Sequence, residues 1–269
     1  IISTHSPFFL LGLEKEFGKD GFDILNLPNG KRINIEQFAE FKDAFNSIIS
    51  SRECRNWIDG LQKEGKPLLI TEGATDAKII LTAWTKLYSP IDIPFEITGP
   101  LTDDQGGAKD LNRILRQCPF FPKSVVGIFD HDKTGCDQFK GIKDWPLDTT
   151  DNNLRKKPDL EHYALLLPIP DNRKTFRNKI CGRDGDWHVE IEHYFSNDVL
   201  LKNNMVYEID EAKNDNPFTI NDNNKKVFSE NIDKLSKEDF VTFNILFDKL
   251  KAIGFINSES TTGERTTIY

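Results

Sequence analysis

Two short stretches of the sequence, residues 68–76 and 125–132, each join an apolar run to carboxylates that follow it. Carboxylates at the carboxyl ends of neighbouring strands in an open α/β sheet converge on the crevice where ligands bind. Four acids gathered there repel one another unless a hard cation lies between them. The pattern therefore predicts a magnesium site that acts on phosphates. Its acids are Glu72, Asp76, Asp130 and Asp132.

The spacing of these acids suits phosphodiester hydrolysis, which needs charge neutralisation, an activated nucleophile and a stabilised leaving oxygen. One or two magnesium ions, roughly 4 Å apart, can supply all three. Asp130 and Asp132 are two residues apart and share one face at a strand end, so both can reach one cation. Asp76 follows Glu72 by four residues and begins a predicted helix, where the helix dipole favours a negative charge.

The segments around these acids alternate between strand-like and helix-like patterns. Apolar runs predict strands, and apolar residues at helical spacing predict helices between them. Strand, helix, strand, helix, strand is typical of an α/β fold with a parallel sheet and helices packed on it. In chain order the segments are 67–71, 76–87, 93–98, a helix after Gly107, and 124–129. Residues 131–161 are polar and rich in Asp and Lys, and they predict a loop.

The remaining patterns divide the chain into three predicted parts. A break at Gly65-Lys66-Pro67 ends a predicted helix over about 35–62 and marks a domain boundary. Further along, the sequence predicts a strand over 163–169, a helix or helical turn over 190–201, and two amphipathic helices near the C-terminus. The predicted parts are residues 1–64, 65–205 and 206–269.

The chain is acidic, with 269 residues and a net charge of −8. A simple nucleic-acid binder is usually basic, so any binding of a polyanion is expected to be local or to come from the missing part of the protein. Acidity does not exclude an enzyme that holds metal ions with carboxylates, because bound cations invert the local field. The sequence lacks a run of 18 apolar residues and a CxxC pair, as expected of a reduced cytoplasmic protein without a membrane span. Met205 is the only methionine and the chain opens within an apolar run, so we expect the C-terminal part of a longer protein.

Two motifs resemble known families. Glu72-Gly73-x-x-Asp76 followed by Asp130-x-Asp132, each after an apolar strand, resembles the Toprim domain of topoisomerases, primases and nucleases. Thr4-His5-Ser6-Pro7 after an apolar run resembles the histidine switch of ABC-type ATPases. An ABC-type ATPase end followed by a Toprim domain is the layout of the overcoming-lysogenization-defect (OLD) nucleases and of the Gabija defence nuclease. The resemblance covers about residues 1–10 and 66–250, and it implies a Toprim-type parallel sheet with a helical C-terminal tail.

The resemblance also implies roles for individual residues. The four acids would hold Mg²⁺ or Mn²⁺, with Glu72 also assisting proton transfer, and Glu192 in Ile191-Glu192-His193-Tyr194 would complete a second metal site. Lys225, or Lys226 in its place, would contact the scissile phosphate and stabilise its developing charge. His5 would sense the γ-phosphate of ATP bound in the absent N-terminal part. The chain departs from the family in lacking a Walker A motif, in a long insert before Asp130 and in loose spacing around Glu192.

The expected function is that of a Mg²⁺- or Mn²⁺-dependent DNA endonuclease of the OLD type, regulated by ATP. By resemblance, the expected setting is anti-phage defence, with a homodimer and a possible defence-system partner. A basic patch nearby is either a solvated face or a set of phosphate contacts that position DNA without reading its sequence. The patch comprises Arg173, Lys174, Arg177, Lys179 and Arg183.

Two alternatives remain open at this point. Residues 128–134 also resemble the first motif of haloacid-dehalogenase-like phosphatases, in which Asp130 would be a covalent nucleophile and Asp132 the acid/base. That interpretation leaves Glu72 and Asp76 unexplained. The other alternative is a catalytically silent Toprim domain that serves nucleic-acid binding or assembly.

Overall fold

The computed structural model divides the chain into two compact units, Ile1–Trp57 and Ile58–Tyr269. It describes residues 13, 16–18, 21–26, 30–33, 66–99, 106–117, 124–174, 188–206 and 219–257. In the first unit, β1 (Ile24–Asn26) pairs with β2 (Lys31–Ile33) as an antiparallel ribbon. His5, the predicted helix over 35–62 and the predicted boundary between residues 64 and 65 lie outside the described residues.

The second unit is built on a five-stranded sheet with the strand order β4-β3-β5-β7-β6. Its strands are β3 (Leu68–Ile70), β4 (Glu96–Thr98), β5 (Val125–Phe129), β6 (Leu154–Lys156) and β7 (His162–Leu166). Four strands run parallel, and the edge strand β6 is antiparallel to β7. Every residue of β3, β5 and β7 is buried, as expected where helices cover both faces of a parallel sheet. The α/β prediction is confirmed at this level.

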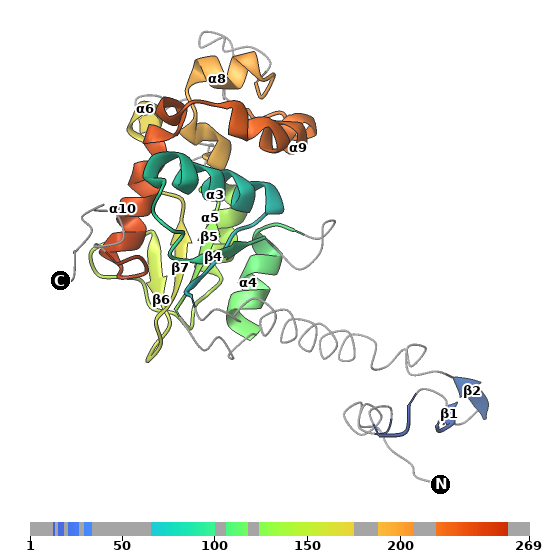
Figure 1. Cartoon of the computed structure of the whole chain (residues 1–269). Coiled ribbons are helices and arrows are strands. Elements are labelled where there is room, and N and C mark those ends of the chain that lie inside the picture. Colours follow the sequence, from blue (N-terminus) through green and yellow to red (C-terminus); the bar gives the residue numbers. More distant parts are fainter. Residues whose placement is uncertain are drawn as a thin grey trace, which may run out of the picture. The chain divides into compact units, whose positions relative to one another are not determined.

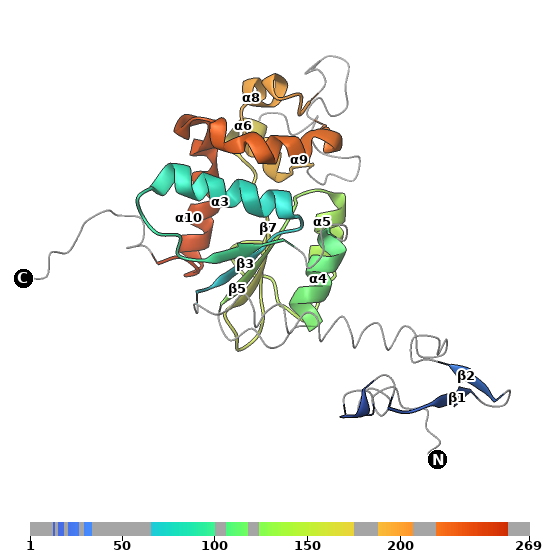
Figure 2. The same cartoon turned by 45° about the vertical axis from the view of Figure 1, so that its right-hand side comes forward.

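Helices cover the two faces in different ways (Figures 1 and 2). On one face, α3 (Ala74–Tyr88) packs with the C-terminal helices over side chains such as Val126 and Ile128. On the other face lie α4 (Ala108–Gln117) and α5 (Lys133–Lys140). A Cβ on Gly127 would lie 2.5 Å from Leu115 of α4, so the missing side chain lets α4 approach β5 closely.

The C-terminal helices belong to the same hydrophobic core as the sheet. They follow the short helix α6 (Asp171–Lys174). Contacts between aromatic rings connect these helices to α3 and to each other. The ring centroids of Trp84 and Phe247 are 5.2 Å apart, and those of Phe195 and Phe228 are also 5.2 Å apart. Within the described part of the chain, no helix combines the length and apolar character that crossing a membrane requires. The elements are η4 (Ile191–Tyr194), α8 (Asn197–Lys202), α9 (Asp222–Asn231), η5 (Ile232–Lys234), η6 (Lys237–Phe243) and α10 (Asn244–Ala252).

The prediction of a loop over residues 131–161 is wrong, because this segment contains α5 and β6. α5 has only eight residues, and it buries Cys136 and Phe139 while its other side stays polar. β6 is an edge strand in which only Leu154 is buried, so its composition resembles that of a surface loop. Both elements are shorter than the windows over which periodicity is informative.

The chain leaves two neighbouring strands in opposite directions. β3 continues into α3 on one face of the sheet, whereas β5, paired beside it, continues into α5 on the other face (Figure 2). In open α/β sheets this divergence opens a crevice at the carboxyl ends of the two strands. The four predicted acids follow these two strand ends.

A core substitution tests whether the C-terminal helices stabilise the sheet unit. Phe247→Ala removes a fully buried ring that packs on Trp84 and Tyr88, so we expect a loss of about 3–5 kcal/mol in the free energy of unfolding. The measurement is urea unfolding of the full chain. Val241→Ala, on an exposed side chain of η6, is the control and should change stability by less than about 0.5 kcal/mol. Equal small effects would contradict the shared core.

Candidate functional site

The first two acidic segments meet through a direct hydrogen bond. Glu72 follows β3, and its Oε1 accepts the backbone N–H of Asp130, which follows β5, at 2.9 Å. The register of the two strands places Ile70 beside Gly127, so both strand ends lie at the same edge of the sheet. The backbone carbonyl of Glu72 accepts the N–H of Gly107 at 2.8 Å, which also ties the start of α4 to this point. Residues far apart in sequence thus meet at one edge of the sheet.

Asp76 lies in the first turn of α3 and closes the turn that begins the helix. Its Oδ2 accepts the N–H of Gly73 at 2.9 Å, and Thr75 donates its hydroxyl to Oδ1 at 3.2 Å. The hydroxyl of Thr71 donates to the carbonyl of Gly73 at 2.7 Å and stiffens the same turn. Asp76 therefore stabilises the first turn of α3 and also adds negative charge to the acidic cluster.

Asp132 is the N-cap of α5, and its Oδ1 accepts the N–H of Gly135 at 2.6 Å. Gly135 permits a very close approach, because a Cβ there would lie 2.0 Å from the carbonyl oxygen of Asp130 and 3.1 Å from Glu72 Oε1. The first turn of α5 therefore lies directly against Asp130 and Glu72. The N-cap hydrogen bond therefore explains the position of one carboxylate oxygen of Asp132 without a bound ligand.

A third segment joins the crevice through the backbone. His131 and Val189 form an antiparallel bridge, with N–H···O distances of 2.8 and 3.0 Å. This bridge brings η4, with Glu190 before it and Glu192 within it, beside the end of β5. Glu192 is only 1% exposed, and neither of its carboxylate oxygens has a hydrogen-bond partner within the described residues. A buried carboxylate in this state is costly unless a cation or a proton compensates it.

Glu190 is a site residue that the sequence analysis missed. It lies two residues before Glu192, and its charge contributes to the electrostatics of Asp76, Asp130 and Glu192. The only sequence signal was the alternation Glu-Ile-Glu, which is too short to separate from an ordinary surface pattern. The acids brought together therefore include Glu190 in addition to the predicted set.

Lys225 faces these acids from α9. Its Nζ forms an ion pair with Glu190 and another, at 3.1 Å, with Asp222. The neighbouring Lys226 is exposed. Of the two lysines considered from sequence, Lys225 is the one next to the acidic cluster.

Arg173 of the predicted basic patch lies in the interior of the described part of the chain. Arg173 is 1% exposed and donates hydrogen bonds to the carbonyls of His193 and Phe195, and to Asn197 Oδ1, at 2.6–2.9 Å. It therefore clamps η4 from inside, and the expectation of a solvated or DNA-facing Arg173 is wrong. Composition could not reveal this, because the partners are mostly backbone carbonyls. Lys174 pairs with Asp171, and the other three patch residues lie outside the described residues.

Burial and mutual repulsion shift the acids strongly. Burial raises the pKa of Glu72 to about 8, against the hydrogen bond from Asp130, and repulsion by Asp132 and Asp76 adds to the shift. Burial likewise raises the pKa of Asp130 well above its usual range, with repulsion from Asp76 and Glu72. The cluster therefore resists full ionisation when no cation is bound.

The second half of the cluster behaves similarly but includes the lysine. Burial raises the pKa of Glu192 to about 8, although the charge of Lys225 opposes this shift. Burial raises the pKa of Asp76 to about 6, again against Lys225. Burial lowers the pKa of Lys225, but attraction to Glu192 and Glu190 outweighs it, so the lysine remains charged.

The donor set fits a hard divalent cation in its chemistry. Carboxylate oxygens are the preferred ligands of Mg²⁺. The two unpartnered oxygens of Glu192 and the raised pKa values of Glu72 and Glu192 both indicate that the ionised cluster lacks enough positive charge nearby to balance it. Among the described residues, however, no three His, Cys, Asp or Glu side chains are already arranged to hold one ion. Several of the acids instead point their oxygens at backbone amides, so cation binding requires side-chain rotation.

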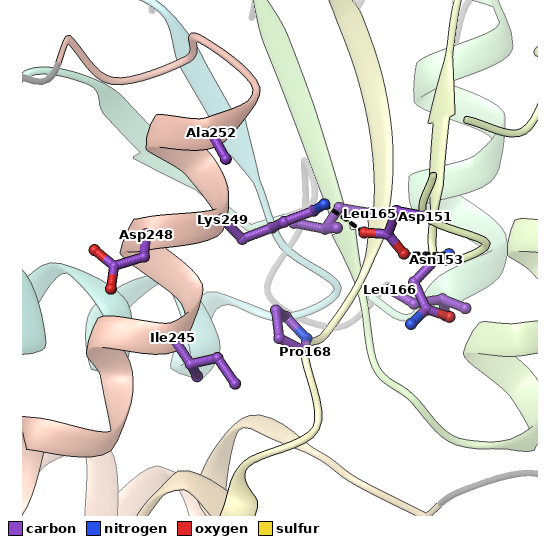
Figure 3. Close-up of a pocket in the computed structure, with 9 residues that line it drawn as sticks. All are labelled: Asp151, Asn153, Leu165, Leu166, Pro168, Ile245, Asp248, Lys249 and Ala252. Carbon is purple, nitrogen blue, oxygen red and sulfur yellow. Dashed lines mark hydrogen bonds and ion pairs between the residues drawn. The ribbon is translucent and has the colours of Figure 1, made fainter. Parts of the chain in front are cut away.

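A separate pocket lies between β7 and α10 and contains none of the predicted site residues (Figure 3). Its volume is about 310 Å³, and the ion pair between Lys249 and Asp151 crosses from α10 to the segment before β6. Its lining includes Leu165, Leu166 and Pro168. The acidic crevice, rather than this pocket, carries the chemistry predicted from sequence.

No protein-family profile, curated protein or solved structure matches this chain. The functional argument therefore rests on the residues and geometry of the crevice.

Gly135 offers a test of the close contact between α5 and the acids. Gly135→Ala should lower the free energy of unfolding by about 1–3 kcal/mol, because the added Cβ collides with the carbonyl of Asp130. Helix propensity alone would favour alanine. Chemical denaturation provides the measurement, and Thr134→Ala, at an exposed position of the same helix, provides the control. A stabilising Gly135→Ala would mean that the contact is absent.

The raised pKa values predict how stability depends on pH and on metal. Glu72 and Glu192 have pKa values of about 8 in the folded chain against 4.5 normally. The folded chain therefore binds more protons than the unfolded chain in this interval, so stability falls as pH rises from about 4.5 to about 8. Saturating Mg²⁺ should raise the melting temperature by roughly 5 °C at pH 8 and much less at pH 5.5.

Thermal unfolding at both pH values, with Mg²⁺ and with a chelator, measures this dependence. Ca²⁺ and Na⁺ at matched ionic strength separate specific binding from general screening. An equal effect of Mg²⁺ at both pH values, or none at either, would contradict a cation site formed by these acids.

Proposed function

We propose that this chain is the nuclease part of a Mg²⁺- or Mn²⁺-dependent DNA endonuclease of the Toprim type. The observation that carries the proposal is the contact of Glu72 after β3 with Asp130 after β5, at the crevice where the two crossovers diverge. Lys225 and two further acids, Glu190 and Glu192, surround the same point. Acids that converge beside a lysine suit a phosphodiester substrate better than a neutral one.

In the proposed reaction, the residues of the acidic cluster have separate roles in phosphodiester hydrolysis. Metal binding would involve Glu72, Asp76, Asp130, Asp132 and Glu192, after rotation of the side chains that now contact backbone amides. When bound, the cation would neutralise the phosphate and lower the pKa of a water molecule. Glu72 would assist proton transfer from that water, because a bound cation would lower the pKa that burial and repulsion raise in the metal-free chain.

Lys225 would stabilise negative charge on the phosphate. It remains charged, and it reaches the acids from a helix whose position is fixed by ring packing between Phe228 and Phe195. An ammonium group aimed at a phosphoryl oxygen stabilises the charge that develops during attack. Lys225 is therefore the residue of α9 that we expect to touch substrate.

The wider proposal follows the resemblance to OLD nucleases. Residues 1–64 would be the end of an ABC-type ATPase domain, with His5 near the γ-phosphate of ATP. We propose that ATP regulates cleavage, that the chain works in the cytoplasm as a homodimer, and that its setting is anti-phage defence with a possible partner. These properties depend on the motif at His5, which lies outside the described residues.

The phosphatase alternative fits the crevice less well. A covalent aspartyl-phosphate at Asp130 would place a dianion among Glu72, Asp76, Glu190 and Glu192, all of which already raise the pKa of Asp130. That crowding of like charge disfavours Asp130 as a nucleophile. A silent Toprim domain remains as an outcome of the experiment below.

Substitution of Asp130 tests the proposed activity. Asp130→Asn should lower Mg²⁺-dependent nicking of supercoiled plasmid by about 100-fold or more, since it removes a central charged ligand. The metal-free variant should also melt at a higher temperature at pH 8, because repulsion in the cluster is relieved. Asp137→Asn, an exposed aspartate of α5, is the matched control and should nick like the parent.

The outcomes separate the alternatives. Equal nicking by parent and Asp130→Asn would end the nuclease proposal. Phosphate release from a small ester, with a trapped aspartyl-phosphate, would favour the phosphatase. DNA binding without cleavage by the parent would indicate a silent domain.

A further inference from the structure

Lys225 has two carboxylate partners in very different surroundings. Its pair with Glu190 is sheltered, since the two side chains are 25% and 26% exposed. Its pair with Asp222, one turn earlier on the same helix, involves a carboxylate that is 83% exposed. Exposed pairs within a helix contribute little, so Glu190 is the partner that fixes the position of the ammonium.

Glu190 is rigidly placed, whereas the lysine side chain is long. Both the N–H and the carbonyl of Val189 form hydrogen bonds with the backbone of His131. The N–H of Glu190 donates to His193 Nδ1 at 2.9 Å. Arg173 holds the next turn through the carbonyls of His193 and Phe195. Lys225 reaches across from another element on a flexible four-carbon stem. If the pair opens, the lysine is the group that moves.

The position of the pair matters because Glu190 and Lys225 both act on the acids of the crevice. Lys225 attracts Asp76 and Glu192, whereas Glu190 repels them. In the substrate-free chain the ammonium therefore serves as an internal counter-ion for the cluster. A phosphate entering the crevice competes with Glu190 for the same ammonium group.

We propose that Glu190 is a positioning residue that acts through Lys225. It holds the Lys225 ammonium beside the acids until a phosphate of the nucleic-acid backbone replaces Glu190 as the partner of the lysine. This inference rests on the proposed nuclease function and deepens it. Glu190 sets a threshold for binding: only a polyanion that enters the crevice fully can displace it from Lys225. Loosely bound anions leave the pair intact.

The test is a double-mutant cycle on the full chain, with duplex DNA as the probe and Ca²⁺ in place of Mg²⁺. Glu190→Gln keeps the shape and removes the charge, so the dissociation constant should fall roughly fivefold. With Mg²⁺, KM in the nicking assay should fall by a similar factor. In a Lys225→Met background, Glu190→Gln should leave the dissociation constant unchanged.

Asp222→Asn is the matched control, because it removes the other carboxylate partner of the same lysine from an exposed position. Its effect on DNA affinity should stay below about twofold. An equal effect of Glu190→Gln with and without Lys225 would overturn the proposal. Weaker DNA binding, or a higher Mg²⁺ requirement, in Glu190→Gln would also overturn it and make Glu190 a metal ligand instead.

Failure of the inference can be told apart from failure of the proposed function. If the parent nicks DNA but the cycle shows no coupling, the role of Glu190 is refuted and the nuclease stands. If the parent neither binds nor nicks DNA, the proposed function fails and this role fails with it. Urea unfolding of the parent, the two single variants and the double variant, without metal or DNA, then reports whether the ion pair itself exists.

Discussion

The hydrogen bond from the Asp130 amide to the Glu72 carboxylate joins the ends of β3 and β5, and the remainder of the site is arranged around it. This contact forces several carboxylates into a partly desolvated crevice, where their charges repel. The surrounding structure has to compensate. Backbone amides donate hydrogen bonds to the carboxylates of Asp76 and Asp132, and the ammonium of Lys225 adds a positive charge. Protons neutralise those acids whose pKa is raised.

Compensation by backbone amides gives the acids two roles. Asp76 caps the first turn of α3 and Asp132 is the N-cap of α5, so each carboxylate stabilises the helix that follows its strand. Those helices leave toward opposite faces of the sheet (Figure 2), and in open α/β sheets ligands bind where such connections diverge. The residues that favour this local geometry are thus the ones proposed to do the chemistry. A substitution at either position is expected to change the fold and the site together.

The sequence predicted the meeting of the acidic segments where its signals were local and strong. The apolar runs of β3 and β5, each followed by acids, indicated both the strands and the sheet edge at which Glu72 and Asp130 meet. It failed where burial depends on distant partners. Arg173 looked like a surface cation because its carbonyl partners leave no mark in composition, and Glu190 looked ordinary until Lys225 was found opposite. α5 was missed because only two bulky side chains, Cys136 and Phe139, mark its buried face.

The order of the segments that form the acidic cluster, including the one joined through the bridge between His131 and Val189, has a consequence for synthesis of the protein. The crevice takes its acids from three separated segments and its lysine from a fourth, and the last of these emerges from the ribosome only after the whole sheet. A nascent chain that stops short of α9 carries Glu72, Asp130 and Glu192 but lacks the balancing ammonium of Lys225. The order of the segments therefore delays charge compensation by the lysine until α9 has been translated, after every strand of the sheet.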